Sequence, residues 1–373
     1  MKKPRIAIIL PNLNGGGAER VNVNIANSFS LRGYSVDMVL LSATGDFLAE
    51  LSPKVRLIDL KIKRIRGALL PLMTYIRKRR PDAILVSMWP LTIIALLSRV
   101  IAFIPTRMFV VEHTTWSRDP IASSVTGRWI VSTSMRLVFS LANGVITVSK
   151  GVADDLSIFA KIERKLITVI YNPIVGIKLP TVNEQLEPYE WWSGSHYRII
   201  AVGNLSKSKN FSLLLIAFYH LRKNINAKLL ILGEGSCRPL LEAQAKQLGI
   251  ESNLFMPGFI KNPSLYFNRA DLHVLSSDVE GFGNVIVEAL AAGTPVVSTN
   301  CKSGPSEILC NGQFGKLVPV GDYLRLAAAM CESLSISHDV ESLKARAQDF
   351  SIEKAVDNYE KILMPKLIDG IKL

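Results

Sequence analysis

The chain has 373 residues, of which 49% are hydrophobic and 20% are charged. These shares are typical of a folded soluble protein, and the length exceeds the ~250–300 residues at which one hydrophobic core stops growing. The 18 prolines and 24 glycines are spread along the chain, which excludes a disordered or collagen-like protein. The formal net charge of +13 lies in the first half: residues 1–180 hold 25 basic and 11 acidic side chains, and residues 181–373 hold 19 and 20.

The first half alternates short apolar runs with helical patterns. Helical periodicity is clearest over residues 18–31 and 69–79. Strands rich in Ile and Val are predicted over residues 5–10, 35–41, 83–88, 108–112, 144–149 and 167–171. This alternation predicts a parallel sheet covered by helices on both faces.

Residues 173–197 interrupt the pattern with prolines, a Trp-Trp pair and a Ser-Gly-Ser segment, so we expect an inter-domain linker there. The alternation then resumes, with strands predicted at 197–203, 228–233, 254–258, 272–276 and 295–299 and helices at 211–223, 238–248 and 283–292. A last helix is predicted over 351–367, after a capping serine.

The interpretation is an α/β protein of two tandem doubly wound, Rossmann-like domains. They cover residues 1–172 and 198–349, and residues 350–373 form a C-terminal helix that packs back toward the first domain. Ligands of such sheets bind at the carboxyl ends of the strands, so we expect the site in an inter-domain cleft.

The chain carries no clear targeting or membrane-spanning signal. The apolar run near the N-terminus has five residues and leads into a glycine-rich loop, which fits a first strand better than a signal peptide. The apolar stretch over 88–104 contains Arg99 and is shorter than the ~20 residues of a spanning helix. The four cysteines form no C-x-x-C pair, which favours reduced thiols over a disulfide framework or a zinc site. We expect a cytoplasmic location.

A glycine-rich loop, Gly15-Gly16-Gly17, follows the first predicted strand and opens a helix. Glycines there let the backbone approach a ligand, and the helix N-terminus presents free N–H groups to an anion. The loop is neither G-x-G-x-x-G nor a P-loop, which argues against dinucleotide binding and P-loop ATP hydrolysis. We favour phosphate or sugar contact over a tight turn that only packs the helix.

Two glutamates, Glu280 and Glu288, flank the segment Gly-Phe-Gly-Asn after an apolar strand. If residues 281–288 are mostly helical, the carboxylates lie ~12 Å apart, too far for a glycosidase pair at ~5–10 Å. They can instead hold the two hydroxyl-bearing ends of an extended ligand, with the Gly281 and Gly283 amides and the helix dipole facing its phosphates. A nucleotide-sugar has this layout. The alternative, an exposed cap residue and a solvated helix position, is disfavoured by the Gly-Phe-Gly and Gly-Thr-Pro-Val-Val segments beside them.

These motifs resemble those of glycosyltransferase family 4, which are retaining nucleotide-sugar transferases with the GT-B fold. The resemblance covers nearly the whole chain, and the E-x7-E segment is its most specific part. It implies that Glu280 contacts the transferred sugar, that Glu288 contacts the ribose, and that Gly15, Gly16 and Gly17 contact the diphosphate and sugar.

Residues 203–211 resemble the family's G-R-L…K-N motif, whose Arg and Lys hold the diphosphate. Lys209 matches, but Asn204 stands where the family has arginine, and Lys207 is the nearest side chain that could replace that charge. A family histidine that contacts the donor sugar and phosphate matches His113, at the end of a predicted strand. The predicted catalytic residues are His113, Lys209 and Glu280, and the donor-binding set also includes Asn204, Phe282, Gly283, Asn284 and Glu288.

The chemistry that the resemblance implies is electrostatic. A leaving nucleoside diphosphate gains negative charge, which Lys209, the glycine-loop amides and the helix N-terminus near Gly283 can stabilise. The sequence contains no D-x-D triplet. We therefore expect transfer with retention, no metal and no cofactor, and a departing phosphate that acts as the base.

Eight basic residues and no acidic one lie between positions 61 and 80. They are Lys61, Lys63, Arg64, Arg66, Arg77, Lys78, Arg79 and Arg80. Apolar residues, among them Leu70, Leu72 and Ile76, lie between the two basic clusters, as in a helix on an anionic membrane surface or at a lipid diphosphate. Few aromatic residues are interleaved, which disfavours nucleic acid, and a solvated helix face is the plainer alternative.

The sequence therefore favours a transferase that moves a sugar, from a UDP-sugar by preference, to a polyprenyl-diphosphate-linked saccharide at the cytoplasmic face of the membrane. A GDP-mannose-dependent mannosyltransferase is an alternative. A nucleotide-sugar isomerase or hydrolase on the same fold would need acid/base residues, for which only His113 with Glu112 are candidates. A non-catalytic binding module would tolerate loss of the glutamates, and both are present.

Overall fold

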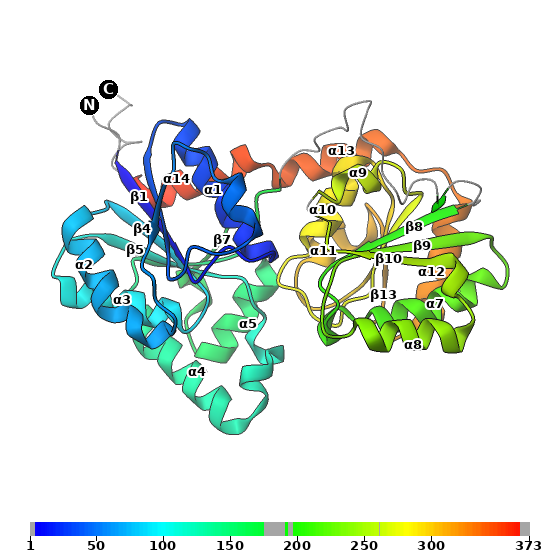
Figure 1. Cartoon of the computed structure of the whole chain (residues 1–373), viewed down its shortest axis with the longest axis horizontal. Helices are drawn as coiled ribbons and strands as arrows, with labels where there is room; N and C mark the ends of the chain where they lie inside the picture. Colours follow the sequence, from blue (N-terminus) through cyan, green and yellow to red (C-terminus); the bar gives the residue numbers. More distant parts are fainter. Residues whose placement is uncertain (1–3, 175–190, 193–196, 261, 366–373) are drawn as a thin grey trace. The chain divides into compact units, whose positions relative to one another are not determined.

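The structure, a computed structural model, describes residues 4–174, 191–192, 197–260 and 262–365. The chain divides into two compact α/β units, unit 1 (Met1–Ile174 and Phe350–Leu373) and unit 2 (Val175–Asp349). Figure 1 shows a sheet with helices on both faces in each unit. Most of the predicted linker, residues 175–190 and 193–196, lies outside the described residues, as does the end of the predicted last helix beyond residue 365.

Unit 1 is built on a seven-stranded parallel sheet with the order β3-β2-β1-β4-β5-β6-β7. Apart from the exposed edge strand Arg56–Asp59 and the partly exposed edge strand Ile167–Val169, its strands are buried on both faces and rich in Ile, Val and Leu, as in other parallel sheets. They are β1 (Arg5–Leu10), β2 (Ser35–Leu40), β3 (Arg56–Asp59), β4 (Ala83–Ser87), β5 (Arg107–Glu112), β6 (Gly144–Thr147) and β7 (Ile167–Val169).

The helices of unit 1 cover both faces of this sheet. One core cluster joins one face of the sheet to α2 (Leu69–Arg79), α3 (Leu91–Ala102), α4 (Val125–Val138) and α5 (Lys150–Ala160). On the other side, α1 (Gly17–Leu31) packs against α14 (Ile352–Leu363), as Figure 1 shows. Arg32, just after α1, donates to Glu360 of α14 at 2.7 Å, so the last described helix is tied to unit 1.

Unit 2 has a six-stranded parallel sheet with the order β10-β9-β8-β11-β12-β13. The strands are β8 (Tyr197–Val202), β9 (Ala227–Leu232), β10 (Leu254–Gly258), β11 (Leu272–Leu275), β12 (Val296–Thr299) and β13 (Lys316–Val318). The helices are α7 (Phe211–Arg222), α8 (Arg238–Leu248), α9 (Ser264–Phe267), α10 (Asn284–Ala292), α11 (Pro305–Ile308), α12 (Tyr323–Ser335) and α13 (Val340–Ala347).

The prediction of doubly wound α/β domains is confirmed, although some elements, such as β3, α3 and α4, were not predicted and others end at different residues. The strand predicted over 144–149 ends at Thr147, because the Ser149 hydroxyl accepts a hydrogen bond from the Val152 amide and so caps α5. Helix α14 covers Ile352–Leu363 of the last predicted helix, whose expected end at residue 367 lies outside the described residues. Among the described helices, none is long and apolar enough to cross a membrane.

Each sheet has one point at which the strand order reverses. It lies between β1 and β4 in unit 1 and between β8 and β11 in unit 2. Ligands of doubly wound sheets bind beyond the carboxyl ends of the strands at such a point. The loops that follow these four strands are therefore the places to examine for a site.

Candidate active site

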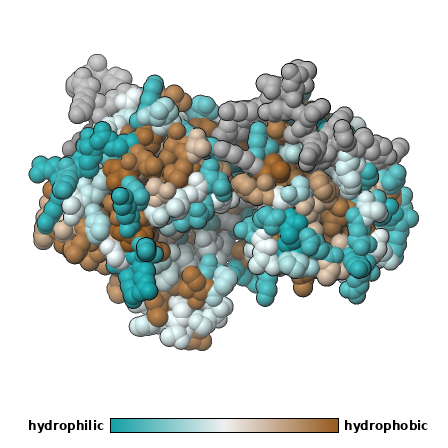
Figure 2. Space-filling view, viewed as in Figure 1, coloured by the Kyte–Doolittle hydropathy of each residue, from teal (hydrophilic) through white to brown (hydrophobic). Residues whose placement is uncertain are grey.

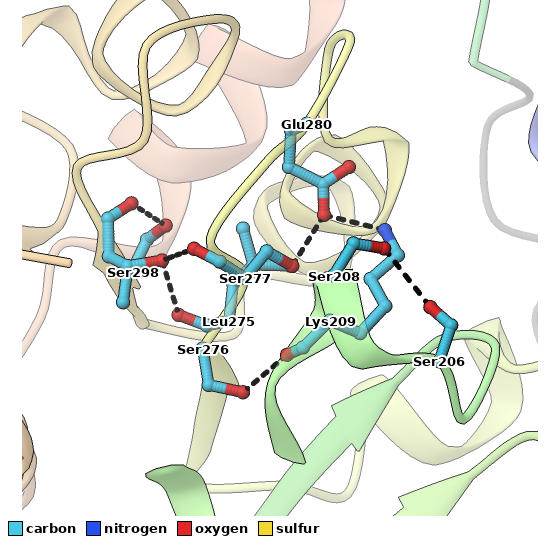
Figure 3. A network of polar contacts seen from close by, with 9 residues as sticks. Ser206, Ser208, Lys209, Leu275, Ser276, Ser277, Glu280 and Ser298 are labelled. Carbon is cyan, nitrogen blue, oxygen red and sulfur yellow. Dashed lines mark hydrogen bonds and ion pairs between the residues drawn. The ribbon is translucent and has the colours of Figure 1, made fainter. Parts of the chain in front are cut away.

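The loops after β8 and β11 meet at the switch point of unit 2 (Figure 3). The amide of Asp278 donates to the carbonyl of Ser208 at 2.8 Å, and the Ser276 hydroxyl donates to the carbonyl of Lys209 at 2.9 Å. These bonds hold the two loops at a fixed distance. They place Lys209, from the first loop, beside Glu280, from the second.

Lys209 and Glu280 form an ion pair, with Nζ 2.5 Å from Oε1. The Glu280 side chain is only 8% exposed and that of Lys209 is 24% exposed, so the pair is largely shielded from water. The Ser277 hydroxyl also donates to the same carboxylate oxygen at 2.6 Å. Glu280 is thus a buried, oriented carboxylate, and the alternative of an exposed cap residue is wrong.

The pair rests on a polar layer beneath it. Thr299, at the end of β12, donates from Oγ1 to the carbonyl of Ser277 at 2.6 Å, so the residue that holds Glu280 is itself held. Burial, with a smaller effect of the Glu280 carboxylate, raises the pKa of the nearby Cys301 thiol to about 12. That thiol stays protonated at neutral pH and is a poor nucleophile.

The start of α10 depends on two glycines. Gly283, the N-cap residue, has a φ of 95°, and Gly304 has a φ of 91° in the loop that passes beside it. A Cβ on Gly304 would lie 1.7 Å from the backbone oxygen of Phe282. Because Gly283 is left-handed and α10 begins at Asn284, five of the residues 281–288 are helical and the first three are not, so the helical rise alone does not set the separation of Glu280 and Glu288.

The remaining predicted donor residues of unit 2 lie around this centre. Phe282 is buried beneath the loop, and Asn284 and Glu288 are half-buried on α10. Asn204 is exposed in the loop after β8, where a Cβ on Gly235 would lie 2.5 Å from its Oδ1. Lys207 is exposed two residues before Lys209.

In unit 1, the loop Gly15-Gly16-Gly17 follows β1 and leads into α1, with Gly16 as its N-cap. A Cβ on Gly16 would lie 2.2 Å from Oε2 of Glu19, so that carboxylate lies directly over the glycine. Burial raises the pKa of Glu19. The N-terminus of α1, which favours anions, therefore already faces an acidic group of the protein.

His113 follows directly after β5, at the same edge of the sheet and two strands from the glycine loop. Among the described residues, neither of its ring nitrogens has a hydrogen-bond partner, and burial lowers its pKa to about 4. The imidazole is therefore neutral at pH 7. It can donate or accept a hydrogen bond but supplies no positive charge.

From the sequence, Glu112, the residue before His113, is a candidate only for an acid or base. Its Oε2 accepts a hydrogen bond from Nε1 of Trp116 at 3.0 Å, which closes the turn that carries His113. Burial raises the pKa of Glu112 to about 8. Glu112 and Trp116 therefore support the position of His113. The Glu-His-x-x-Trp spacing is the only sign of this supporting role in the sequence.

Of the eight basic residues in segment 61–80, Arg79 is half-buried and the other seven are exposed, but both Arg79 and Arg77 make hydrogen bonds within unit 1. Arg79 binds the buried carboxylate of Asp37 through two hydrogen bonds of 3.2 Å, and Arg77 donates to the carbonyls of Ile101 and Ala102. Of the apolar residues between the clusters, Leu72 and Ile76 are fully buried in the core. The expectation that this apolar stretch faces a membrane is therefore wrong for those two side chains.

Two families match consecutive parts of the chain. The family described as Glycosyltransferase Family 4 matches residues 15–175, and the family described as Glycosyl transferases group 1 matches residues 190–350. Each match covers most of one unit. The chain therefore belongs to the family 4 glycosyltransferases and is a glycosyltransferase, as the motifs indicated.

Among its relatives are two transferases of Campylobacter jejuni. The N-acetylgalactosamine-N,N'-diacetylbacillosaminyl-diphospho-undecaprenol 4-alpha-N-acetylgalactosaminyltransferase is 28% identical and covers 99% of this chain and 97% of its own. The GalNAc-alpha-(1->4)-GalNAc-alpha-(1->3)-diNAcBac-PP-undecaprenol alpha-1,4-N-acetyl-D-galactosaminyltransferase is 24% identical and covers 96% and 98%. The crystal structure of Anabaena HepE in complex with UDP-glucose superimposes with a TM-score of 0.80 at 20% identity, over 98% of this chain and 100% of that one. This likeness identifies the GT-B fold.

Proposed function

We propose that this protein transfers a sugar from a UDP-sugar to a saccharide carried on a polyprenyl diphosphate, in the synthesis of a surface polysaccharide or glycan. The observation that carries the proposal is the shielded Lys209–Glu280 pair at the switch point of unit 2. Both Campylobacter relatives are named as transferases that act on undecaprenol-linked saccharides, and they match nearly the full chain.

The chemistry follows from the pair. When the bond to the sugar breaks, the leaving UDP gains negative charge on its β-phosphate, and a cation fixed beforehand lowers the energy of that state. Lys209 is such a cation, because Glu280 holds it in place and the loop bonds hold its backbone. The Glu280 carboxylate, oriented by Lys209 and Ser277, is suited to accept a hydrogen bond from a hydroxyl of the transferred sugar.

The other residues are assigned by their chemistry. Glu288, on the second turn of α10, receives the hydroxyls of the ribose, and the amides of Gly283 and Asn284 lie at a helix N-terminus suited to phosphate. In unit 1, neutral His113 contacts the donor sugar, and Gly15, Gly16 and Gly17 offer backbone amides. In unit 2, Asn204 supplies a hydrogen bond without charge, so Lys209, with the exposed Lys207, provides the positive charge in the loop after β8.

We further propose that transfer retains the anomeric configuration and needs no metal. Lys209 provides the charge that a divalent ion would otherwise supply to the diphosphate. The departing phosphate itself takes the proton of the acceptor hydroxyl, so no side chain is assigned as nucleophile. The expected result is that EDTA leaves the rate unchanged and that NMR of the product shows an anomeric centre of the donor's configuration.

The reaction is tested by incubating the purified full chain with a panel of UDP-sugars and GDP-mannose and with undecaprenyl-diphosphate-linked saccharides. We expect UDP release that depends on the acceptor and a lipid product with one added sugar. Release of GDP from GDP-mannose would replace the donor assignment. Release that does not depend on the acceptor would support a hydrolase, and absence of turnover together with nucleotide-sugar binding would support a binding module.

We also propose that the protein works at the cytoplasmic, anionic surface of a membrane, where its lipid-linked acceptor lies, and does not bind nucleic acid. Among the described residues, six of the eight basic side chains in segment 61–80 have no hydrogen-bond or ion-pair partner. They are Lys61, Lys63, Arg64, Arg66, Lys78 and Arg80. Such side chains suit anionic lipid head groups, each contributing about 1 kcal/mol close to the surface.

A further inference from the structure

The outer side of helices α3 and α4 is unusually apolar. In the part of the chain that the structure describes, 21 large hydrophobic residues are exposed, and ten of them lie between positions 97 and 141. On α3 the exposed positions Leu97, Val100 and Ile101 recur at helical spacing, while the opposite side of the helix is buried in the core. A helix that is apolar all round needs a second apolar partner.

Helix α4 packs against α3 and also exposes apolar side chains. Val125 is 88% exposed and Trp129 is 67% exposed, and Leu137 follows two turns later on the same side at 65%. The C-cap residue of α3, Phe103, is 85% exposed. We call the surface formed by Leu97, Val100, Phe103, Val125, Trp129 and Leu137 the α3–α4 apolar face. In Figure 2, brown atoms lie along the lower left of unit 1, over α3, and again at its lower end, over α4.

The charge carried by the helices α2, α3 and α4 themselves has one sign. The helices α2, α3 and α4 contain six basic residues and not one acidic residue. Arg77 of α2 donates to the carbonyls of Ile101 and Ala102, so the basic end of α2 lies directly against the end of α3 that carries Phe103. On α4, Arg128 and Arg136 are exposed among the apolar residues.

An apolar face with basic residues and no acid matches one partner in particular. A second copy of this chain would bring the same positive charge against it, which opposes self-association. An anionic bilayer offers hydrocarbon for the apolar side chains and phosphate for the arginines, and tryptophan is favoured at the boundary between the two.

We propose that the α3–α4 apolar face inserts into the outer layer of an anionic membrane, with Trp129 and Leu137 as anchors and Arg128 and Arg136 at the head groups. This inference deepens the proposed function, on which its biological purpose rests, by naming the surface that docks on the lipid. The basic segment 61–80 then adds long-range attraction beside the inserted face.

The test is sedimentation of the full chain with extruded vesicles of phosphatidylcholine alone or of phosphatidylcholine with phosphatidylglycerol. We expect binding to the anionic vesicles that weakens with salt. The double variant Trp129→Gln/Leu137→Gln should lose about tenfold or more of its partitioning, because two anchors no longer enter the hydrocarbon. The matched control, Leu240→Gln/Leu324→Gln on exposed sites of unit 2, should bind as the wild type does.

Two further measurements keep the test decisive. Lipids with brominated acyl chains should quench part of the tryptophan fluorescence, and Trp129→Phe should remove that part. The variant Glu288→Ala, chosen to stop transfer, should bind vesicles normally. Failure of the donor-site assignment can therefore be distinguished from failure of the membrane proposal. The proposal is overturned if the wild type does not bind, if the double variant binds equally well, or if ultracentrifugation shows a dimer that the double variant alone abolishes.

Discussion

Replacing Lys209 with methionine tests whether the Lys209–Glu280 pair is both structural and catalytic. The substitution keeps most of the length of the side chain but removes the cation that pairs with the 8%-exposed Glu280 carboxylate, which also accepts a hydrogen bond from the Ser277 hydroxyl. Breaking a buried pair by removing one partner costs roughly 3–5 kcal/mol, and the 24% exposure of Lys209 reduces this to about 2–4 kcal/mol. For a protein of this size, that lowers Tm by roughly 3–5 °C.

The assay combines thermal unfolding with the transfer rate. The double variant Lys209→Met/Glu280→Gln removes the unpaired charge, so it should regain at least half of the lost stability while transfer stays reduced by about 10²-fold or more. The matched control is Lys316→Met, since the Lys316–Glu332 pair has the same 2.5 Å separation but side chains that are 30% and 63% exposed. It should cost less than about 1 kcal/mol and leave transfer unchanged. If Lys209→Met is as stable as the control, or the double variant is no more stable than the single one, the reasoning is wrong.

Three further outcomes are expected. The free energy of unfolding should fall by up to about 1.4 kcal/mol per pH unit from pH 6.5 to 8, because the raised pKa of Glu112, about 8, keeps it protonated in the folded state while the unfolded chain releases the proton. Below pH 6.5 the lowered pKa of His113, about 4, acts in the opposite direction. Urea melts of Glu112→Gln should show no decline in the free energy of unfolding between pH 6.5 and 8. Glu288→Ala should reduce turnover about 10²-fold or more with Tm nearly unchanged. Normal turnover of this variant would contradict the assignment of Glu288 to the ribose. Gly304→Ala should cost about 3 kcal/mol or more, because a Cβ would lie 1.7 Å from a backbone oxygen, whereas Gly312→Ala, at a similar φ but with open space around it, should cost only about 1–2 kcal/mol in the same melts.

The strands and the family could be predicted because their signals are local. The run over residues 5–10 ends in the structure where the sequence predicts, since a strand buried on both faces must be apolar throughout. The edge strand β3 was missed because it is exposed and reads Arg-Leu-Ile-Asp, without the apolar run of an interior strand. The helices α3 and α4 were also missed: α3 lies in a continuous apolar stretch that shows no clear periodicity.

The site was predicted in its residue types but not in their contacts. The sequence indicates that Lys209 and Glu280 serve one ligand, yet their direct pairing depends on β8 and β11 being neighbours across a crossover. The role of Asp37 as a hydrogen-bond acceptor could not be predicted for the same reason, because its donors Arg79 and Tyr75 lie on a helix about 40 positions further along the chain. Left-handed glycines such as Gly283 shift a helix start by only a few residues, which changes the distance between two side chains without altering the motif.

The chain passes out of unit 1 after Ile174 and returns at Phe350, and the two ends are joined there. The amide of Ile174 donates to the carbonyl of Phe350 at 3.0 Å, and Ile174 pairs with Ser351 as a parallel bridge. Unit 2 is thus a contiguous insert, whereas unit 1 is assembled from two separated stretches. A chimera that exchanges residues 175–349 for those of a relative would keep both junctions, so substrate choice could be engineered by replacing this one segment. Truncation at residue 174 would instead remove α14, which packs against α1, and leave the remaining fragment without part of its own core.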